Sequence, residues 1–416
     1  MRALGWGEVC DPAEADAAIF VTCSIRDKAE QKVISELGRF RTLWDRARKP
    51  QVALLGCMAQ RVGERVAKRF PWVKVVAGPR HLGAVPGAIE AAHTDGVVRL
   101  ILDEDPNALD DLHCVPTQRS ATHKAYVTIA HGCDQFCSYC IVPYVRGRFG
   151  SRQPGEILEE VRGLAAAGVI EITLLGQNVN TYGKDFTGAA AYRFARLLAD
   201  VASVDGLRRV RFTTSHPIDF TDDILETMRS CPNVCPSINL PVQSGSDKVL
   251  REMNRKYDRG QYLDVVEKIR SLLPEVGLTT DLIVGFPGET EEEFEESCSL
   301  AEQVRFDLVH TAAYSPREGT PAARRDDQVP GRERLRRLNR INAIQARIAE
   351  EINREMLGRI VEIIPDETAP KGNGLLQGRT ATDKVVLVDA GIAEIGKAID
   401  VRITSARAWC LEAVLP

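Results

Sequence analysis

The chain has 416 residues, of which 44% are apolar and 27% are charged, and its formal net charge is −4 at pH 7. This length is too great for one ordinary core, and the composition excludes a disordered or fibrous protein. The sequence contains neither a signal-peptide pattern nor an apolar stretch of about 20 residues, so we expect a cytoplasmic protein without membrane association. Because the net charge is not positive, any binding of nucleic acid has to depend on local patches.

Residues 1–103 alternate short apolar runs with helical patterns. The runs at 18–23, 51–57 and 73–78 are typical of buried parallel strands, which predicts a small α/β domain. The chain opens on a helix remnant, whereas a doubly wound domain has a strand before that helix, so we expect the first strand of this domain to be missing. Residues 104–124 are rich in Asp, Pro and Thr, which indicates a linker.

The β–α alternation resumes in residues 125–330 and predicts a partial (β/α)6 barrel of parallel strands. The six strand candidates lie at 125–130, 170–178, 209–215, 237–245, 279–286 and 308–315. A linking helix is expected at 331–357, with apolar residues on one face and many arginines on the other. Residues 358–416 contain short strands separated by glycine turns, which predicts a small OB-like β-barrel.

Eleven cysteines in a long chain argue against a disulfide framework and for metal or redox chemistry. Cys133, Cys137 and Cys140 follow a predicted strand with Cys-x3-Cys-x2-Cys spacing. Three thiolates on one loop can hold three irons of a [4Fe–4S] cluster and leave the fourth iron open for a ligand. The alternatives are a zinc site, in which His131 is the fourth ligand, or three unrelated cysteines.

The triplet resembles the signature of the radical S-adenosylmethionine (SAM) superfamily. The segments at 174–183, 211–217, 240–257 and 281–290 resemble the radical SAM methylthiotransferases, in the branch that acts on tRNA. The resemblance covers almost the whole chain, and the C-terminal barrel resembles the TRAM domain, an RNA-binding module. It implies methylthiolation of C2 of an N(6)-dimethylallyl adenosine beside the tRNA anticodon, with one SAM as methyl donor and another as radical source.

Small and polar residues end several of the predicted barrel strands, where barrel enzymes assemble their sites. Each alone is typical of an ordinary turn. Together with the resemblance they form the expected SAM-binding set: Gly176, Gln177, Asn178, Ser215, Gln243, Ser244, Gly285 and Gly288.

A second cysteine pair, Cys23 and Cys57, ends two neighbouring strands of the N-terminal domain. Spacing alone does not distinguish a shared metal centre from two buried thiols, and both interpretations remain. Methylthiotransferases hold an auxiliary [4Fe–4S] cluster on three N-terminal cysteines, and the resemblance implies that these are two of them. The resemblance implies that the third cysteine lies on a strand that would precede this chain, so we expect the auxiliary cluster to be labile. We expect the SAM cluster, in a separate domain, to be independent of the auxiliary cluster.

The resemblance also implies tRNA, a flavodoxin- or ferredoxin-like electron donor and a sulfur donor as partners, and we expect a monomer. Arg146, Arg148 and Arg152 lie beside the cysteine triplet and are the candidate phosphate contacts. Two other functions stay open. One is methylthiolation of an aspartate on a small-subunit ribosomal protein, and the other is a non-catalytic iron–sulfur or RNA-binding protein.

Overall fold

The computed structural model describes residues 1–24, 27–103, 122–187, 192–370, 372 and 374–416. These residues form two compact units, described separately below. The N-terminal unit comprises the described residues within 1–117, 131–149 and 317–320, and the C-terminal unit comprises those within 118–130, 150–316 and 321–416. The loop with the cysteine triplet thus groups with the N-terminal unit. The predicted linker at 104–124 lies outside the described residues except for its last three positions.

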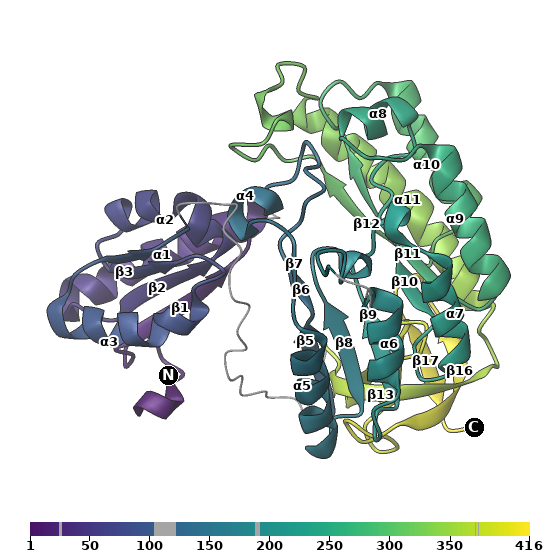
Figure 1. Ribbon diagram of the computed structural model, residues 1–416, viewed down its shortest axis with the longest axis horizontal. Helices are drawn as coiled ribbons and strands as arrows, with labels where there is room; N and C mark the ends of the chain where they lie inside the picture. Colours follow the sequence, from purple (N-terminus) through teal and green to yellow (C-terminus); the bar gives the residue numbers. More distant parts are fainter. Residues whose placement is uncertain (25–26, 104–121, 188–191, 371, 373) are drawn as a thin grey trace. The chain divides into compact units, whose positions relative to one another are not determined.

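The N-terminal unit contains a four-stranded parallel sheet in the order β1-β2-β3-β4 (Figure 1). Its elements are β1 (Ala17–Thr22), α1 (Asp27–Ala47), β2 (Gln51–Gly56), α2 (Cys57–Arg69), β3 (Val73–Ala77), α3 (Val85–Asp95) and β4 (Arg99–Ile101). The three predicted strands are present. The fourth is too short to give an apolar run that sequence analysis can detect.

Two hydrophobic clusters cover the two faces of this sheet. Leu54 on β2 packs with Leu37 and Trp44 of α1, whereas its neighbour Leu55 packs with Ile89 of α3. Successive residues of a strand point to opposite faces, so a strand covered on both sides is apolar throughout. This explains the continuous apolar run at 51–57.

The C-terminal unit contains six parallel strands in two three-stranded sheets, β5-β8-β9 and β10-β11-β12. Their bounds are β5 (Lys124–Thr128), β8 (Glu171–Leu175), β9 (Arg209–Phe212), β10 (Ser237–Asn239), β11 (Gly277–Val284) and β12 (Leu308–Ala313). A parallel bridge between Val210 of β9 and Val234, three residues before β10, links the two sheets, and the Ser215 N–H donates to the Asn239 carbonyl of β10. All six predicted strands are present. The break occurs at β10, which is short because Pro236 and Pro241 flank it and proline has no N–H for the ladder.

Helices cover the outside of these strands, as the partial barrel predicts (Figure 1). They are α5 (Pro154–Ala166), α6 (Phe194–Ala202), α7 (Asp222–Ser230), α8 (Asp247–Glu252), α9 (Arg259–Leu272), α10 (Glu291–Val304) and α11 (Gly331–Arg354). Capping boxes at Asp258 with Gln261 and at Thr290 with Glu293 define the starts of α9 and α10.

The C-terminal segment forms the predicted closed barrel, in the strand order β13-β14-β15-β17-β16. Its strands are β13 (Ile360–Thr368), β14 (Leu375–Arg379), β15 (Val385–Asp389), β16 (Ile399–Ala406) and β17 (Leu411–Val414). Two buried arginines of β9 attach the barrel to the sheet. Arg209 donates to the carbonyls of Glu362 and Arg379, and Arg211 donates to those of Thr380 and Ala381.

None of the helices in the described part of the chain has the length and apolar content that a bilayer crossing requires.

Candidate functional site

The cysteine triplet lies on a loop that is closed by its own backbone contacts. Short strands at Ala130–His131 (β6) and Gly150–Ser151 (β7) pair at its two ends. The Cys133 N–H donates to the Gly147 carbonyl at 3.3 Å, and the Cys140 N–H donates to the Cys137 carbonyl at 3.0 Å. These bonds define the path of the backbone around the three cysteines.

Gly132 makes the closure possible. Its φ is +69°, and a Cβ at this position would lie 1.9 Å from the Arg148 carbonyl oxygen. A side chain is excluded on both counts, because left-handed backbone and contact with a carbonyl each disfavour an L residue. Asp134 adds to the closure, since its carboxylate accepts the Phe149 N–H and pairs with Arg148.

The three cysteines differ in exposure: Cys137 is buried, and Cys133 and Cys140 are half-buried. Among the described residues, no three His, Cys, Asp or Glu side chains converge as a complete metal-ligand set. The case for a cluster therefore comes from the donor chemistry, three thiol groups on one backbone-closed loop, which fits a three-cysteine [4Fe–4S] cluster.

The second cysteine pair lies at one edge of the N-terminal sheet. Thr22 at the end of β1 is in register with Gly56 at the end of β2, so Cys23 and Cys57 follow paired positions. Gly56 has φ of +95°, and a Cβ on it would lie 2.4 Å from the Thr22 carbonyl oxygen, so glycine permits this close approach. Cys57 is buried and Cys23 is exposed. The fully buried Ser24 hydroxyl, beside Cys23, has no hydrogen-bond partner within the described residues. A bound ligand could therefore form a hydrogen bond with it.

In the C-terminal unit, four buried polar atoms at the ends of β8 and β9 have no partner within the described residues. They are Gln177 Oε1, Asn178 Oδ1, Ser215 Oγ and His216 Nδ1. Buried polar atoms in native proteins are almost always hydrogen-bonded, so a group of them in adjacent loops indicates a polar ligand. Three of the four belong to the predicted SAM-binding set.

Sequence analysis missed the residues that organise these loops. The buried Asp219 carboxylate accepts from Asn178 Nδ2 and Thr181 Oγ1 and pairs with Lys184. Burial opposes the charge of Asp219, but the Lys184 pair and these hydrogen bonds outweigh it and lower the pKa of Asp219. Burial, followed by the charge of Arg255, lowers the pKa of His216 to about 3, so its ring is neutral at pH 7. Only the tertiary fold shows that these residues meet.

Of the other five predicted SAM-binding residues, Gly176 makes only ordinary contacts, because an added Cβ would lie 3.4 Å from Val179 and 3.5 Å from the Ala130 carbonyl oxygen. The remaining four have structural explanations of their own. Gln243 has φ of +76° and bridges to Leu282 of β11, and the Ser244 hydroxyl lies 3.4 Å from that of Ser297. Gly285 and Gly288 are in left-handed conformations, and their added Cβ atoms would contact the chain's own Arg334, Arg325 and Asp327 side chains. Close packing within the protein thus explains the two glycines without a ligand.

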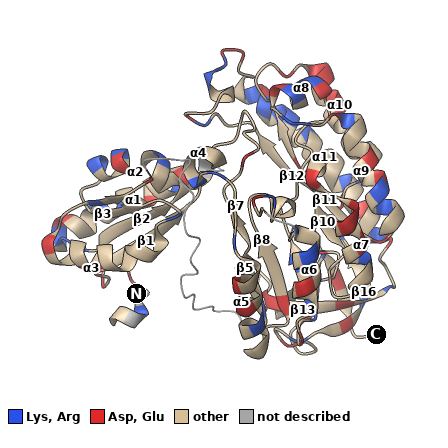
Figure 2. Ribbon diagram, in the orientation of Figure 1, with Lys and Arg blue, Asp and Glu red and all other residues tan. Residues whose placement is uncertain are grey.

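The three arginines beside the triplet also differ. Arg148 is exposed. Arg152 is 5% exposed and donates to the Thr128 carbonyl and to Glu160, which is a structural environment rather than a phosphate contact. Arg146 is half-buried, and its Nε lies 3.2 Å from Cys57 Sγ. The arginines of α11 interleave with acidic residues, as Figure 2 shows, and Arg336, Arg340 and Arg347 pair with glutamates of α10.

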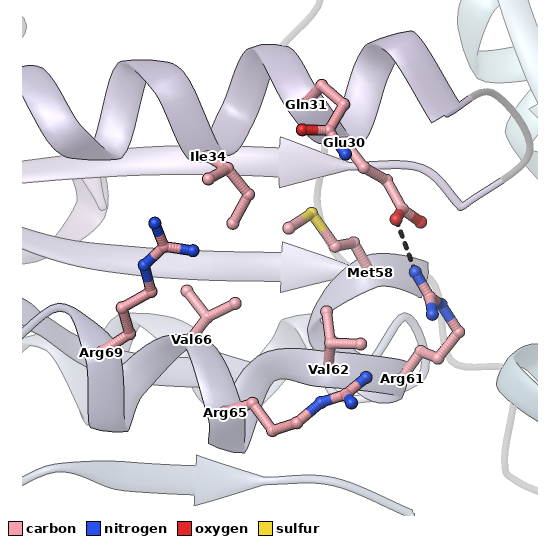
Figure 3. A pocket seen from close by; sticks show the side chains of 9 residues that line it. All are labelled: Glu30, Gln31, Ile34, Met58, Arg61, Val62, Arg65, Val66 and Arg69. Carbon is pink, nitrogen blue, oxygen red and sulfur yellow. Dashed lines mark hydrogen bonds and ion pairs between the residues drawn. The ribbon is translucent and has the colours of Figure 1, made fainter. Parts of the chain in front are cut away.

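A pocket of about 220 Å³ lies between α1 and α2 (Figure 3). Arg61, Arg65 and Arg69 of α2 line it at four-residue spacing, around apolar side chains such as Met58 and Ile34. Arg61 is already paired with Glu30, and Arg65 with Glu318. None of the predicted site residues lines this pocket, so it is not the expected cofactor site.

Family models match three separate segments of the chain. The model for the radical SAM superfamily matches residues 127–301, that for the uncharacterized protein family UPF0004 matches 1–78, and that for the TRAM domain matches 354–415. Among solved structures, the radical SAM methyltransferase TsrM from Kitasatospora setae, with tryptophan and a SAM analogue bound, aligns with a TM-score of 0.56 at 13% identity. This alignment covers 74% of this chain and 64% of that one, and it shows similarity of fold.

Curated relatives match over nearly the whole chain. The tRNA-2-methylthio-N(6)-dimethylallyladenosine synthase of Clostridium botulinum is 44% identical over 95% of this chain and 88% of its own length. The synthase of Carboxydothermus hydrogenoformans is 43% identical over 98% of this chain and 93% of its own length. The synthase of Acetivibrio thermocellus is 41% identical over 98% of this chain and 85% of its own length. With its radical SAM and TRAM domains, the chain therefore belongs to the family of tRNA-2-methylthio-N(6)-dimethylallyladenosine synthases.

Proposed function

We propose that this protein transfers a methylthio group to C2 of N(6)-dimethylallyl adenosine beside the anticodon of tRNA. The observation that carries the proposal is 41–44% identity to the synthases over nearly the whole chain, with the cysteine triplet on a backbone-closed loop. The radical SAM family implies one [4Fe–4S] cluster and SAM as cofactors.

Cys133, Cys137 and Cys140 hold this cluster. When bound, the cluster would supply the electron for reductive cleavage of SAM, which is the source of the radical that activates an inert C–H bond. The protein contributes the geometry. Gly132 and the Cys133–Gly147 hydrogen bond close the loop that carries the three thiols. Gln177, Asn178 and Ser215 contact SAM through polar atoms that otherwise lack a partner within the described residues.

Cys23 and Cys57 bind the auxiliary [4Fe–4S] cluster, which supplies sulfur. Their positions at one sheet edge, the buried Ser24 hydroxyl and the soft thiol donors fit an iron–sulfur centre. Cys57 also begins α2, where the partial positive charge of a helix N-terminus stabilises a metal-bound thiolate.

The barrel at 360–414 captures the tRNA. Trp409 is 53% exposed and offers a flat surface for a base, and the exposed Arg402 and Arg407 offer charge for phosphates. Arg148 remains a candidate phosphate contact on the cysteine loop, whereas Arg152 does not, because it is buried. A flavodoxin- or ferredoxin-like protein donates the electron, a separate sulfur donor restores the auxiliary cluster, and the enzyme acts as a monomer.

The test is anaerobic reconstitution followed by nucleoside mass spectrometry of tRNA bearing dimethylallyl adenosine. The protein should produce the methylthio nucleoside and 5′-deoxyadenosine, and Cys133→Ala, Cys137→Ala and Cys140→Ala should each abolish both products. The matched control is Cys231→Ala, because Cys231 lies at the end of α7, outside both cysteine sets, and this variant should retain activity. Transfer to an aspartate of a small-subunit ribosomal protein in place of tRNA would overturn the proposal.

A further inference from the structure

Arg146 contacts a cysteine that is distant in the sequence. It is the last residue of α4 (Val142–Arg146), six positions after Cys140, and its Nε lies 3.2 Å from Cys57 Sγ at the start of α2. Both residues belong to the N-terminal unit. A guanidinium N–H directed at a sulfur is a charge-assisted hydrogen bond, and such bonds are stronger than those between neutral groups.

The contact is shielded from water. Cys57 is 4% exposed and packs against Ile141 and Val145 of the same segment, which are 5% and 3% exposed. Electrostatic interactions are stronger where apolar side chains exclude solvent. Arg146 itself is half-buried, and its Nε is directed at a sulfur that these apolar side chains shield.

The residues around Arg146 also connect it to the other cysteine set. The next residue, Gly147, accepts the Cys133 N–H, and the Gly147 and Arg148 carbonyls pack against Gly132. One short segment thus contacts the predicted ligands of two centres: Arg146 reaches Cys57 with its side chain, and Gly147 reaches Cys133 with its backbone.

We propose that Arg146 is a positioning residue of the auxiliary iron–sulfur centre, which donates a hydrogen bond to the Cys57 sulfur and offsets its negative charge. The inference rests on the proposed function, in which Cys57 is a ligand of that centre. Hydrogen bonds to the sulfurs are among the factors that set the reduction potential of a cluster, and they hold ligands in their bound orientation. Loss of the guanidinium therefore makes the auxiliary cluster harder to reduce and quicker to lose iron.

The experiment isolates the auxiliary cluster. Cys133, Cys137 and Cys140 are replaced together by Ala, the protein is reconstituted anaerobically, and the remaining cluster is titrated with reductant under EPR detection. In this background Arg146→Gln should lower the midpoint potential and speed the release of iron to a chelator several-fold. Arg146→Lys keeps the charge but not the planar guanidinium, so its midpoint potential and its rate of iron release should lie between those of Arg146→Gln and the parent.

The matched control is Arg65→Gln, the same substitution at an exposed arginine of α2, about two helical turns after Cys57. It should leave the potential and the rate of iron release unchanged. In the chain with all cysteines intact, Arg146→Gln should accelerate iron loss from one cluster while SAM cleavage without tRNA persists.

Three results would overturn the proposal in distinguishable ways. If Cys57→Ala retains the auxiliary cluster, the assignment of Cys57 fails and the role of Arg146 fails with it. If Cys57→Ala loses the cluster but Arg146→Gln changes neither potential nor iron release, the role of Arg146 alone is wrong. If Arg146→Gln instead weakens tRNA binding and flattens its salt dependence, Arg146 contacts phosphate.

Discussion

Replacing Gly132 by Ala tests whether the closed loop, rather than its thiols alone, supports the cluster. The added Cβ would lie 1.9 Å from the Arg148 carbonyl oxygen and 2.6 Å from that of Gly147, and real Cβ atoms do not approach other atoms within 3.0 Å. The backbone on one side has to move by about 1 Å, which breaks the Cys133–Gly147 hydrogen bond.

The magnitude follows from two contributions. Holding an L residue in the left-handed region costs about 1–2 kcal/mol. Displacing packed backbone and losing one hydrogen bond adds about 1–3 kcal/mol. The loop is therefore destabilised by roughly 2–5 kcal/mol, which is enough to depopulate the closed conformation by a factor of about 30 or more.

The assay is iron content and SAM cleavage after anaerobic reconstitution. We expect Gly132→Ala to retain its overall fold by circular dichroism, but to bind less iron at the triplet and to form little 5′-deoxyadenosine. Gly163→Ala is the matched control, because Gly163 lies within α5 and an added Cβ there meets nothing within 4 Å. It should stabilise the protein by up to about 1 kcal/mol. Wild-type iron content and SAM cleavage in Gly132→Ala would refute the reasoning.

Three further predictions concern the C-terminal unit. Burial raises the pKa of Glu289 to about 7 despite the nearby Arg337. Glu289 therefore contributes about 3 kcal/mol of stability that is present below pH 4.5 and lost as the pH rises to about 7, and Glu289→Gln should flatten urea-unfolding stability across that window. Arg209→Met leaves the Glu362 and Arg379 carbonyls without this donor, while the Glu362 carboxylate keeps Arg208, so it should lower the free energy of unfolding by about 1–3 kcal/mol and expose the barrel junction to proteolysis, whereas unchanged stability would contradict a structural role. Trp409→Ala should weaken tRNA binding by roughly 5- to 150-fold without changing its salt dependence, because stacking releases no counterions, while Ile395→Ala, at another exposed apolar position, should not.

The strand pattern was predictable from the sequence because burial on both faces leaves a clear local signal. Every predicted strand of the first two domains is present, and the barrel closes as expected. The division of the six central strands into two sheets was not predicted, although the prolines on either side of β10 contained the information. The short β4 gave no signal, because its pairing with β3 comes from the tertiary fold.

The candidate site was predictable where it depends on spacing and not where it depends on packing. The cysteine triplet and the strand-end amides were found from short motifs. By contrast, Asp219 and Lys184 meet only because the loops after β8 and β9 fold together. The three arginines next to the triplet looked equivalent in sequence. Their burial separates them, since Arg148 is exposed, Arg152 pairs with Glu160 and Arg146 contacts Cys57.

The grouping of the cysteine loop with the N-terminal unit changes how the two centres depend on each other. Sequence analysis placed the triplet in a separate domain and expected it to be independent of the N-terminal cysteines. In the structure, Ile141 and Val145 of the loop segment pack against the buried Cys57. The two cysteine sets thus share a hydrophobic contact, through Ile141 and Val145. A variant that loses one cluster has to be checked for the other before its loss of activity is attributed to a single centre.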